Sequence, residues 1–220
     1  PVAVRTRRAG EALIVETPAL RTQVALDDFR LTVADRAGRV FFSESAPVAT
    51  NSPAGAVQRI ALAPGERFYG LGFQRKALDL RGQKLQWWRA FRSNEATVPF
   101  FLSSRGYGYY SNNTYRHVFD FTGADSFTIA NDGGRQDYFV LPGPSFRHIL
   151  DRYTWLTGRP MLAPRWALGV GYQSRYLEEQ AGVLATARGF RREDLPLDWI
   201  GLEPGWEDVP YAMKWNWSPK

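Results

Sequence analysis

The feature that most constrains the fold is a succession of short strand-like segments between residues 11 and 142. Each is rich in β-branched or aromatic residues, and several alternate, as Phe29, Leu31 and Val33 do. Turn-forming stretches such as DRAGR and NDGGR separate them. Many short strands punctuated by glycine and proline indicate a sandwich or a barrel. The segments are EALIVET (11–17), FRLTVAD (29–35), RVFFSES (39–45), TVPFFLS (97–103), YGYYS (107–111), HVFDFTG (117–123), DSFTIAN (125–131) and DYFVLPG (137–143).

The pattern changes at Pro144. The stretch SFRHILDRYTWLTG has helical spacing of its apolar residues, with Ser145 in position to cap its start and Gly158 to end it. Pro160 and Pro164 then bracket a short connector, which we interpret as a domain boundary. The apolar residues of the predicted helix are Phe146, Ile149, Leu150, Tyr153 and Leu156.

After this connector the predicted order of elements is strand, helix, strand. The apolar run WALGVGY (166–172) predicts a strand, and so does LPLDWIGLE (195–203). Between them, residues 177–193 carry an apolar helical face. The order predicts one βαβ unit with parallel strands and a right-handed crossover. Because one such unit cannot complete a sheet, we expect it to belong to a larger α/β domain.

Composition argues against several classes of partner. The 220-residue chain has no cysteine and only two histidines, His117 and His148, so we expect no metal site and no cofactor. The net charge of +6 comes mostly from scattered arginines beside carboxylates, so we predict no nucleic-acid partner. No apolar run approaches the roughly 20 residues that span a bilayer, so we predict no membrane partner. Nothing in the sequence indicates an oligomeric state.

The excess of aromatic residues points to a different class of ligand. Aromatic residues make up 15% of the chain, which has eight tryptophans. Tryptophan packs in cores, but it also stacks on the flat apolar faces of ligands. Sugars have such faces.

Four stretches resemble glycoside hydrolase family 31, which includes α-glucosidases and α-xylosidases. They occur in the family's order and cover roughly residues 60–206. The resemblance implies a galactose mutarotase-like β-sandwich over 1–143, a linker helix and connector over 144–164, and the beginning of a (β/α)8 barrel over 165–220. The stretches are ERFYGLG (66–72), VPFFLSSRGYGYY (98–110), DRYTWLTGRPMLAPRWALGVGYQSRY (151–176) and FRREDLPLDWIGLE (190–203).

The same resemblance implies retaining hydrolysis of terminal α-linked sugars from oligosaccharides or glycosides. Such enzymes use two carboxylates about 5 Å apart, one as nucleophile and one as acid/base. In the family both aspartates come from later barrel strands, beyond residue 220. We therefore expect no catalytic residue in this chain.

Glu203 is the first candidate for sugar binding. It ends the second strand-like run, and the carboxyl ends of barrel strands face the active site. In many family members an aspartate at the matching position binds sugar hydroxyls, which a carboxylate accepts strongly. The longer glutamate puts the usual glucose-type specificity in doubt. The alternative interpretation is a surface acid at a strand end or a helix-capping acid.

Three further residues are candidates through the resemblance. Tyr176 follows the first barrel strand, where the family often has an aromatic against the same sugar, and the alternative is a tyrosine covering the top of the barrel core. Trp206 would form a stacking wall or simply pack in a loop. Asn94 lies in KLQWWRAFRSNEATV (84–98), a poorly strand-like stretch where the family has a loop over the barrel mouth. Trp87 and Trp88 in that stretch are interpreted as core anchors.

The sequence is compatible with two other functions. One is transglycosylation or lyase chemistry on the same scaffold. The other is a carbohydrate-binding sandwich that has no activity of its own.

Overall fold

The computed structural model describes residues 2–51, 55–73, 76–88, 96–133 and 135–210. Contacts divide the chain into two compact units, Pro1–Arg159 and Pro160–Lys220, which we call unit 1 and unit 2. No helix in the described part of the chain is long and apolar enough to cross a membrane.

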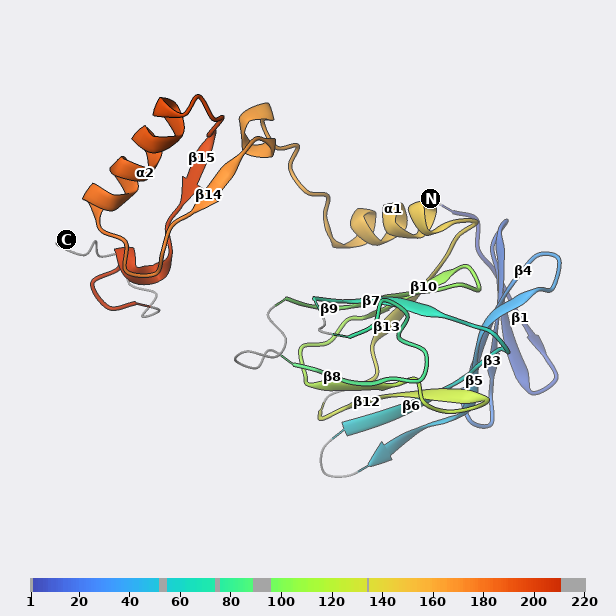
Figure 1. The fold of residues 1–220 in the computed structure, drawn as a ribbon. Coiled ribbons are helices and arrows are strands. Elements are labelled where there is room, and N and C mark those ends of the chain that lie inside the picture. Colours follow the sequence, from blue (N-terminus) through green and yellow to red (C-terminus); the bar gives the residue numbers. More distant parts are fainter. Residues whose placement is uncertain (1, 52–54, 74–75, 89–95, 134, 211–220) are drawn as a thin grey trace. The chain divides into compact units, whose positions relative to one another are not determined.

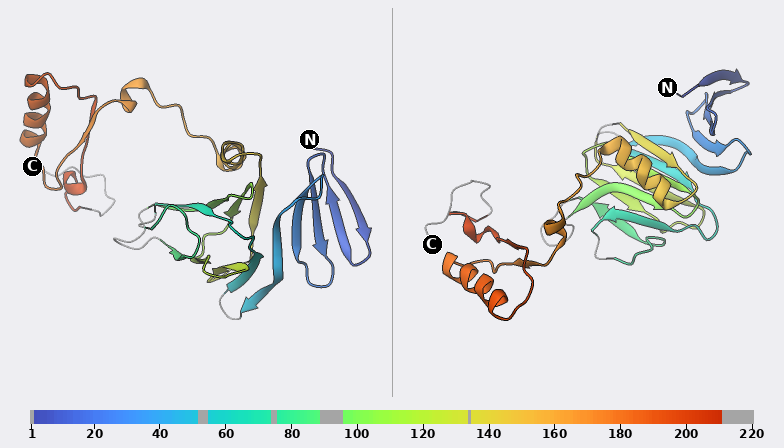
Figure 2. Two further views of the ribbon diagram at one scale, coloured as in Figure 1. Left: turned by 45° about the vertical axis from the view of Figure 1, so that its right-hand side comes forward. Right: turned by 90° about the horizontal axis from the view of Figure 1, so that it is seen from above.

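Unit 1 is mainly β and contains two antiparallel sheets (Figures 1 and 2). Within the described residues, one sheet has the order β1-β2-β3-β4-β5-β6-β12-β11-β8 and the other β13-β10-β9-β7. The strands are β1 (Arg5–Ala9), β2 (Ala12–Glu16), β3 (Leu20–Ala25), β4 (Leu31–Asp35), β5 (Val40–Asn51), β6 (Gly55–Ala61), β7 (Phe68–Gly72), β8 (Lys84–Trp87), β9 (Thr97–Ser103), β10 (Tyr107–Ser111), β11 (His117–Asp120), β12 (Ser126–Asn131) and β13 (Tyr138–Pro142).

The core lies where the two sheets face each other and is built largely from aromatic rings. Alternation along each strand places every second side chain inside. In β12, for example, Phe127, Ile129 and Asn131 are buried while the residues between them are partly exposed. Phe101 of β9 stacks on Tyr109 of β10, with centroids 5.3 Å apart. Each buried aromatic side chain removes about 150–250 Å² from water, so this cluster supplies a large share of the hydrophobic driving force.

Each of the eight strand-like segments of the sequence contains a strand of the structure, so the prediction of a mainly β sandwich is confirmed. Five strands were not predicted, namely β1, β3, β6, β7 and β8. The interpretation of residues 84–98 as poorly strand-like was wrong at its two ends, because Lys84–Trp87 form β8 and β9 begins at Thr97. In β8 only Leu85 is buried, and β1 is exposed along its whole length. Neither strand therefore carries a strong apolar pattern.

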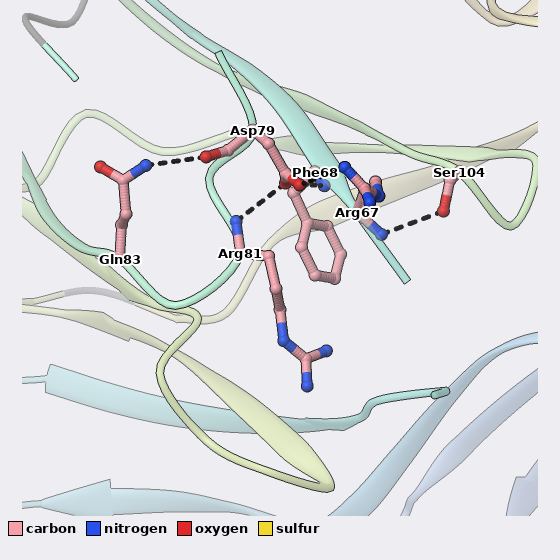
Figure 3. A network of polar contacts seen from close by, with 6 residues as sticks. All are labelled: Arg67, Phe68, Asp79, Arg81, Gln83 and Ser104. Carbon is pink, nitrogen blue, oxygen red and sulfur yellow. Dashed lines mark hydrogen bonds and ion pairs between the residues drawn. The ribbon is translucent and has the colours of Figure 1, made fainter. Parts of the chain in front are cut away.

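Asp79 organises the connection from β7 to β8 (Figure 3). Its Oδ1 accepts hydrogen bonds from the backbone N–H of Phe68, at 3.4 Å, and of Arg81, at 3.0 Å. Its backbone carbonyl accepts one from Gln83 Nε2 at 2.7 Å, and its Oδ2 pairs with Arg67 at 3.3 Å. One carboxylate thus holds the start of β7 and the approach to β8 together.

Gly72 explains part of the ERFYGLG stretch. Its φ is 79°, and a Cβ there would lie 2.0 Å from the carbonyl oxygen of Ala96. Only glycine combines this backbone conformation with so close an approach. The register of β7 against β9 shifts at this point, between Gly70 and Gly72.

Helix α1 (Phe146–Thr157) lies over the four-stranded sheet (Figures 1 and 2). Ile149 is fully buried against Gly108 of β10, where an added Cβ would lie 2.7 Å from its Cγ2. Tyr153 stacks on Phe100 with ring centroids 4.0 Å apart. Ser145 occupies the N-cap position without a side-chain capping bond, and its hydroxyl lies 2.8 Å from His148 Nδ1 instead.

Unit 2 contains a strand, a helix and a second strand: β14 (Gly171–Gln173), α2 (Gln180–Arg192) and β15 (Trp199–Gly201). The two strands are parallel, with Tyr172 opposite Ile200. The predicted strand over 166–172 is partly wrong, because Arg165–Leu168 form a 3₁₀ turn before β14. Asp198 joins the strand starts: its backbone N–H donates to the Val170 carbonyl at 2.8 Å, and its Oδ2 accepts from the Val170 N–H at 3.0 Å.

Candidate functional site

A pocket of about 590 Å³ lies in unit 2 beyond the carboxyl ends of β14 and β15. The start of α2 and the 3₁₀ turn Pro204–Trp206 supply further walls. Leu177, Leu184 and Leu202 are apolar members of its lining, and Glu203 and Glu207 are acidic members. The volume lies within the usual range of ligand pockets, about 300–1,000 Å³.

Glu203 is held at the pocket wall through its backbone. It follows β15 with an extended conformation, φ −71° and ψ 158°, and its N–H donates to Ser174 Oγ at 3.1 Å. The Ser174 N–H in turn donates to the Gly201 carbonyl at 2.9 Å. Ser174 is buried and ties the ends of the two strands together. Sequence reasoning missed this residue, although its place directly after a predicted strand was a usable signal.

The structure brings two of the predicted site residues into one pocket and does not place Tyr176 in its described lining. Trp206 lines the same pocket as Glu203. The side chain of Tyr176 is 44% exposed and does not belong to the described lining. Its backbone instead packs closely against the 3₁₀ turn Pro204–Trp206. A Cβ added at Gly205 would lie 1.8 Å from the Tyr176 carbonyl oxygen. Asn94 lies outside the described residues.

The pocket is rich in negative charge. Besides Glu203, the lining includes the acidic residues Glu178, Glu179, Glu207 and Asp208. Glu207 is buried, and its Oε2 has no hydrogen-bond partner among the described residues. An ionised carboxylate only accepts hydrogen bonds, so this arrangement suits a ligand with many hydroxyl donors. No group of three or more histidine or acidic side chains suited to a metal ion occurs in the described part of the chain.

The two histidines are satisfied locally in unit 1. His117 Nδ1 lies 2.7 Å from the Tyr115 carbonyl, so it carries the proton, and Nε2 accepts from Ser111 Oγ at 2.7 Å. Burial lowers the pKa of His117 below its usual range and keeps the ring neutral. His148 lies on α1, and its Nδ1 contacts the hydroxyl of the N-cap residue Ser145.

Comparison with known proteins identifies the family. Residues 1–120 match the model of the glycosyl hydrolase 31 N-terminal galactose mutarotase-like domain, which is more than half of the chain. The chain belongs to glycoside hydrolase family 31. The β-sandwich of unit 1 is therefore a galactose mutarotase-like domain.

Curated family 31 relatives share moderate identity with the chain. Alpha-glucosidase 2 of Bacillus thermoamyloliquefaciens is 34% identical over 190 residues, which are 80% of this chain and 24% of that protein. Alpha-xylosidase XylQ of Lactiplantibacillus pentosus is 29% identical over 161 residues, 68% of this chain and 21% of that protein. The chain thus spans about a quarter of the length of these relatives.

A solved structure is similar over nearly the whole chain. The family 31 dextranase of Flavobacterium johnsoniae, complexed with isomaltotriose, has a TM-score of 0.87 and 26% identity. The similarity covers 98% of this chain and 28% of that one, so it extends into unit 2.

Proposed function

We propose that the chain is the N-terminal part of a retaining α-glycosidase that releases terminal α-linked sugars from oligosaccharides or glycosides. The observation that carries the proposal is the match of residues 1–120 to the family 31 N-terminal domain. The relatives named alpha-glucosidase and alpha-xylosidase support the α-glycosidic substrate class.

The proposal includes a domain organisation of the chain. Residues 1–143 are the sandwich, 144–164 a linker helix and connector, and 165–220 the beginning of a (β/α)8 barrel. Two observations support the last assignment. The strands β14 and β15 are parallel and joined through α2, which is the repeating unit of such a barrel. Apolar side chains of unit 2, such as Leu184 of α2 and Trp199 of β15, remain exposed, as they would in part of a larger layered domain.

In this proposal the chain binds the sugar and the catalytic acids come from elsewhere in the barrel. Retaining hydrolysis needs two carboxyl groups about 5 Å apart on either side of the scissile bond. The family resemblance assigns both to later barrel strands. Glu203 then accepts hydrogen bonds from hydroxyls of the sugar, and Trp206 forms an apolar wall beside it. Both line the same pocket, which supports the pairing.

The test uses a polypeptide that contains this chain together with a complete barrel. We expect this polypeptide to hydrolyse an aryl α-glucoside or α-xyloside and to release the α-anomer of the sugar first. Proton NMR recorded during the reaction identifies the anomer that is released. The 220-residue chain alone should give no turnover. Initial release of the β-anomer would contradict retention. Formation of new oligosaccharides in place of free sugar would favour the transglycosylase, and an unsaturated sugar product would favour the lyase. Turnover by neither polypeptide, with sugar binding preserved, would leave a non-catalytic binding module.

A further inference from the structure

Ser174 lies directly after β14, one position beyond the last paired residue of that strand, Gln173. Its backbone N–H donates to the Gly201 carbonyl at 2.9 Å, which continues the parallel ladder. In a regular parallel ladder the following hydrogen bond would run from the Glu203 N–H to the Ser174 carbonyl. The Ser174 hydroxyl accepts this bond instead, at 3.1 Å. The last hydrogen bond between the two strand ends therefore depends on the identity of one side chain.

The same hydrogen bond fixes the backbone of Glu203 on its amino side. On its carboxyl side the Glu203 carbonyl accepts from the Trp206 N–H at 3.2 Å, where the 3₁₀ turn Pro204–Trp206 begins. Glu203 has φ −71° and ψ 158° between these two bonds. Because both of its backbone groups are bonded, the direction in which its side chain leaves the backbone is set as well.

A second contact holds the turn against the chain that follows Ser174. A Cβ added at Gly205 would lie 1.8 Å from the Tyr176 carbonyl oxygen and 3.4 Å from the Cα of Leu177. Such an approach of two backbones is open only to glycine. The segments after β14 and β15 are thus held together at two points, and Ser174 supplies the one that bonds Glu203 itself.

We propose that Ser174 is a positioning residue for sugar binding, which acts by fixing the backbone of Glu203. Ser174 is 6% exposed, and its hydrogen bond goes to the backbone of Glu203 rather than to the carboxylate. A misplacement of about 1 Å in a binding group can cost about 100-fold in rate, so the loss of this bond should be measurable. The inference rests on the proposed function, in which the Glu203 carboxylate accepts hydrogen bonds from the sugar.

The experiment is a double-mutant cycle in the polypeptide that contains this chain together with a complete barrel. Ser174→Ala should lower kcat/KM on an aryl α-glycoside about tenfold, mainly through KM, because Glu203 binds the sugar before and during the reaction. In the Glu203→Ala background, Ser174→Ala should cost less than about twofold, since the carboxylate that it positions is absent. Ser174→Thr keeps the hydroxyl and should stay within about threefold of the parent.

Hydrogen exchange on the same polypeptide gives a readout that does not depend on activity. In Ser174→Ala, amides of the peptide that contains Glu203 should exchange about tenfold faster, whereas peptides of β9 and β10 should exchange as in the parent. Ser145→Ala is the matched control, because this exposed serine lies in unit 1 at the start of α1. The control variant should keep both kcat/KM and the exchange rate at Glu203.

Four results would overturn the inference. They are a parent-like kcat/KM in Ser174→Ala, an equal loss from Ser174→Ala in the parent and Glu203→Ala backgrounds, unchanged exchange at Glu203 in Ser174→Ala, and a Ser174→Thr variant that has the thermal midpoint of the parent but the activity of Ser174→Ala. Failure of the proposed function looks different, because the parent polypeptide would then hydrolyse no α-glycoside. Exchange at Glu203 would in that case still decide whether Ser174 holds its backbone.

Discussion

The two units differ in what their apolar residues do. In unit 1, aromatic side chains such as Phe68, Phe101 and Phe119 are fully buried between the sheets. In the described part of unit 2, no apolar side chain is buried, and the buried residues are Ser174 and Glu207. Its large apolar side chains are exposed instead, among them Met161, Leu162, Trp166, Leu168, Leu177, Leu195, Trp199 and Leu202.

The difference follows from the two topologies. Antiparallel strands pair through short turns, so a sandwich closes its own core from neighbouring segments. A parallel pair needs a helical crossover and is normally covered on both faces, so a single βαβ unit leaves apolar faces open. Unit 1 therefore supplies stability from its own contacts, whereas unit 2 carries a candidate binding pocket on a small framework.

The largest contrast is expected in amide hydrogen exchange. If the sandwich opens only with global unfolding, about 5–15 kcal/mol, amides of β9, β10 and β12 should be protected about 10⁴-fold or more. Amides of β14, α2 and β15 should exchange with protection factors below about 100, because little apolar burial opposes their opening. Exchange followed by mass spectrometry on the 220-residue chain measures both. Equal protection of the two regions would show that unit 2 is as stable as the sandwich of unit 1.

A core substitution tests the same contrast energetically. Phe101 is fully buried and contacts six other aromatic rings, those of Phe68, Tyr107, Tyr109, Phe119, Phe121 and Phe127. Phe101→Ala should lower the free energy of unfolding of unit 1 by about 3–5 kcal/mol. Urea denaturation followed by far-UV circular dichroism measures it.

The control for this substitution comes from the other unit. Leu202 is 40% exposed, so Leu202→Ala should leave the main unfolding transition within about 0.5 kcal/mol of the parent. A loss as large as that of Phe101→Ala would show that unit 2 shares the stability of the sandwich.

Glu203 offers a test of function rather than of stability. In a polypeptide with a complete barrel, Glu203→Ala removes a charged acceptor, a loss of about 1.5–3 kcal/mol in binding energy. We expect kcat/KM on aryl α-glycosides to fall roughly tenfold to hundredfold. Glu203→Gln should lose less, because it keeps the shape and some hydrogen bonding. Glu203→Asp should shift preference toward substrates whose hydroxyl reaches further.

The control for Glu203 is another acid of unit 2. Glu193 lies outside the pocket and pairs with Arg192 at 2.9 Å on the surface, so Glu193→Gln should keep kcat/KM. If all three Glu203 variants match the parent while thermal stability is unchanged, Glu203 is only an acid at a strand end.

The sequence predicted those parts of the fold that have a strong local pattern. YGYYS (107–111) became β10 with the same limits, because alternation and flanking turns agree there. β1, with the sequence RTRRA, was missed because its residues are exposed and its pairing with β2 is set by the turn between them. In unit 2, the predicted strand over 166–172 is shortened because Arg165–Leu168 form a 3₁₀ turn, so that β14 begins only at Gly171.

The candidate site was less accessible to sequence reasoning. Position at a strand end was enough to propose Glu203, which lines the pocket with Trp206. Ser174 and Glu207 were missed, because their roles depend on pairing between segments about 30 residues apart and on a turn after β15.

The smallest expected effect is a pH dependence confined to unit 1. Burial lowers the pKa of His117, and the hydrogen bond to the Tyr115 carbonyl and the charge of Asp132 only partly oppose this. Because the folded state binds the proton less tightly than the unfolded state, the unfolded chain gains protons first as pH falls through about 6.5. The His117 contribution to stability is therefore complete above that pH and is lost below it, by at most about 1.4 kcal/mol per pH unit.

Urea midpoints of the main transition at pH 7, 6 and 5 measure this contribution. Substitution of His117 by Gln should lower the midpoint at pH 7, because the contacts to Tyr115 and Ser111 change, but should flatten the decrease between pH 7 and 5. His148→Gln is the matched control: this exposed histidine lies on α1, so the variant should retain the slope of the parent. If the slope is lost in His148→Gln and kept in His117→Gln, the buried histidine does not link the sheets to pH. If both variants keep the slope of the parent, the pH dependence of stability comes from carboxylates and not from His117. The difference in stability between the two units would then be explained by their apolar contacts alone.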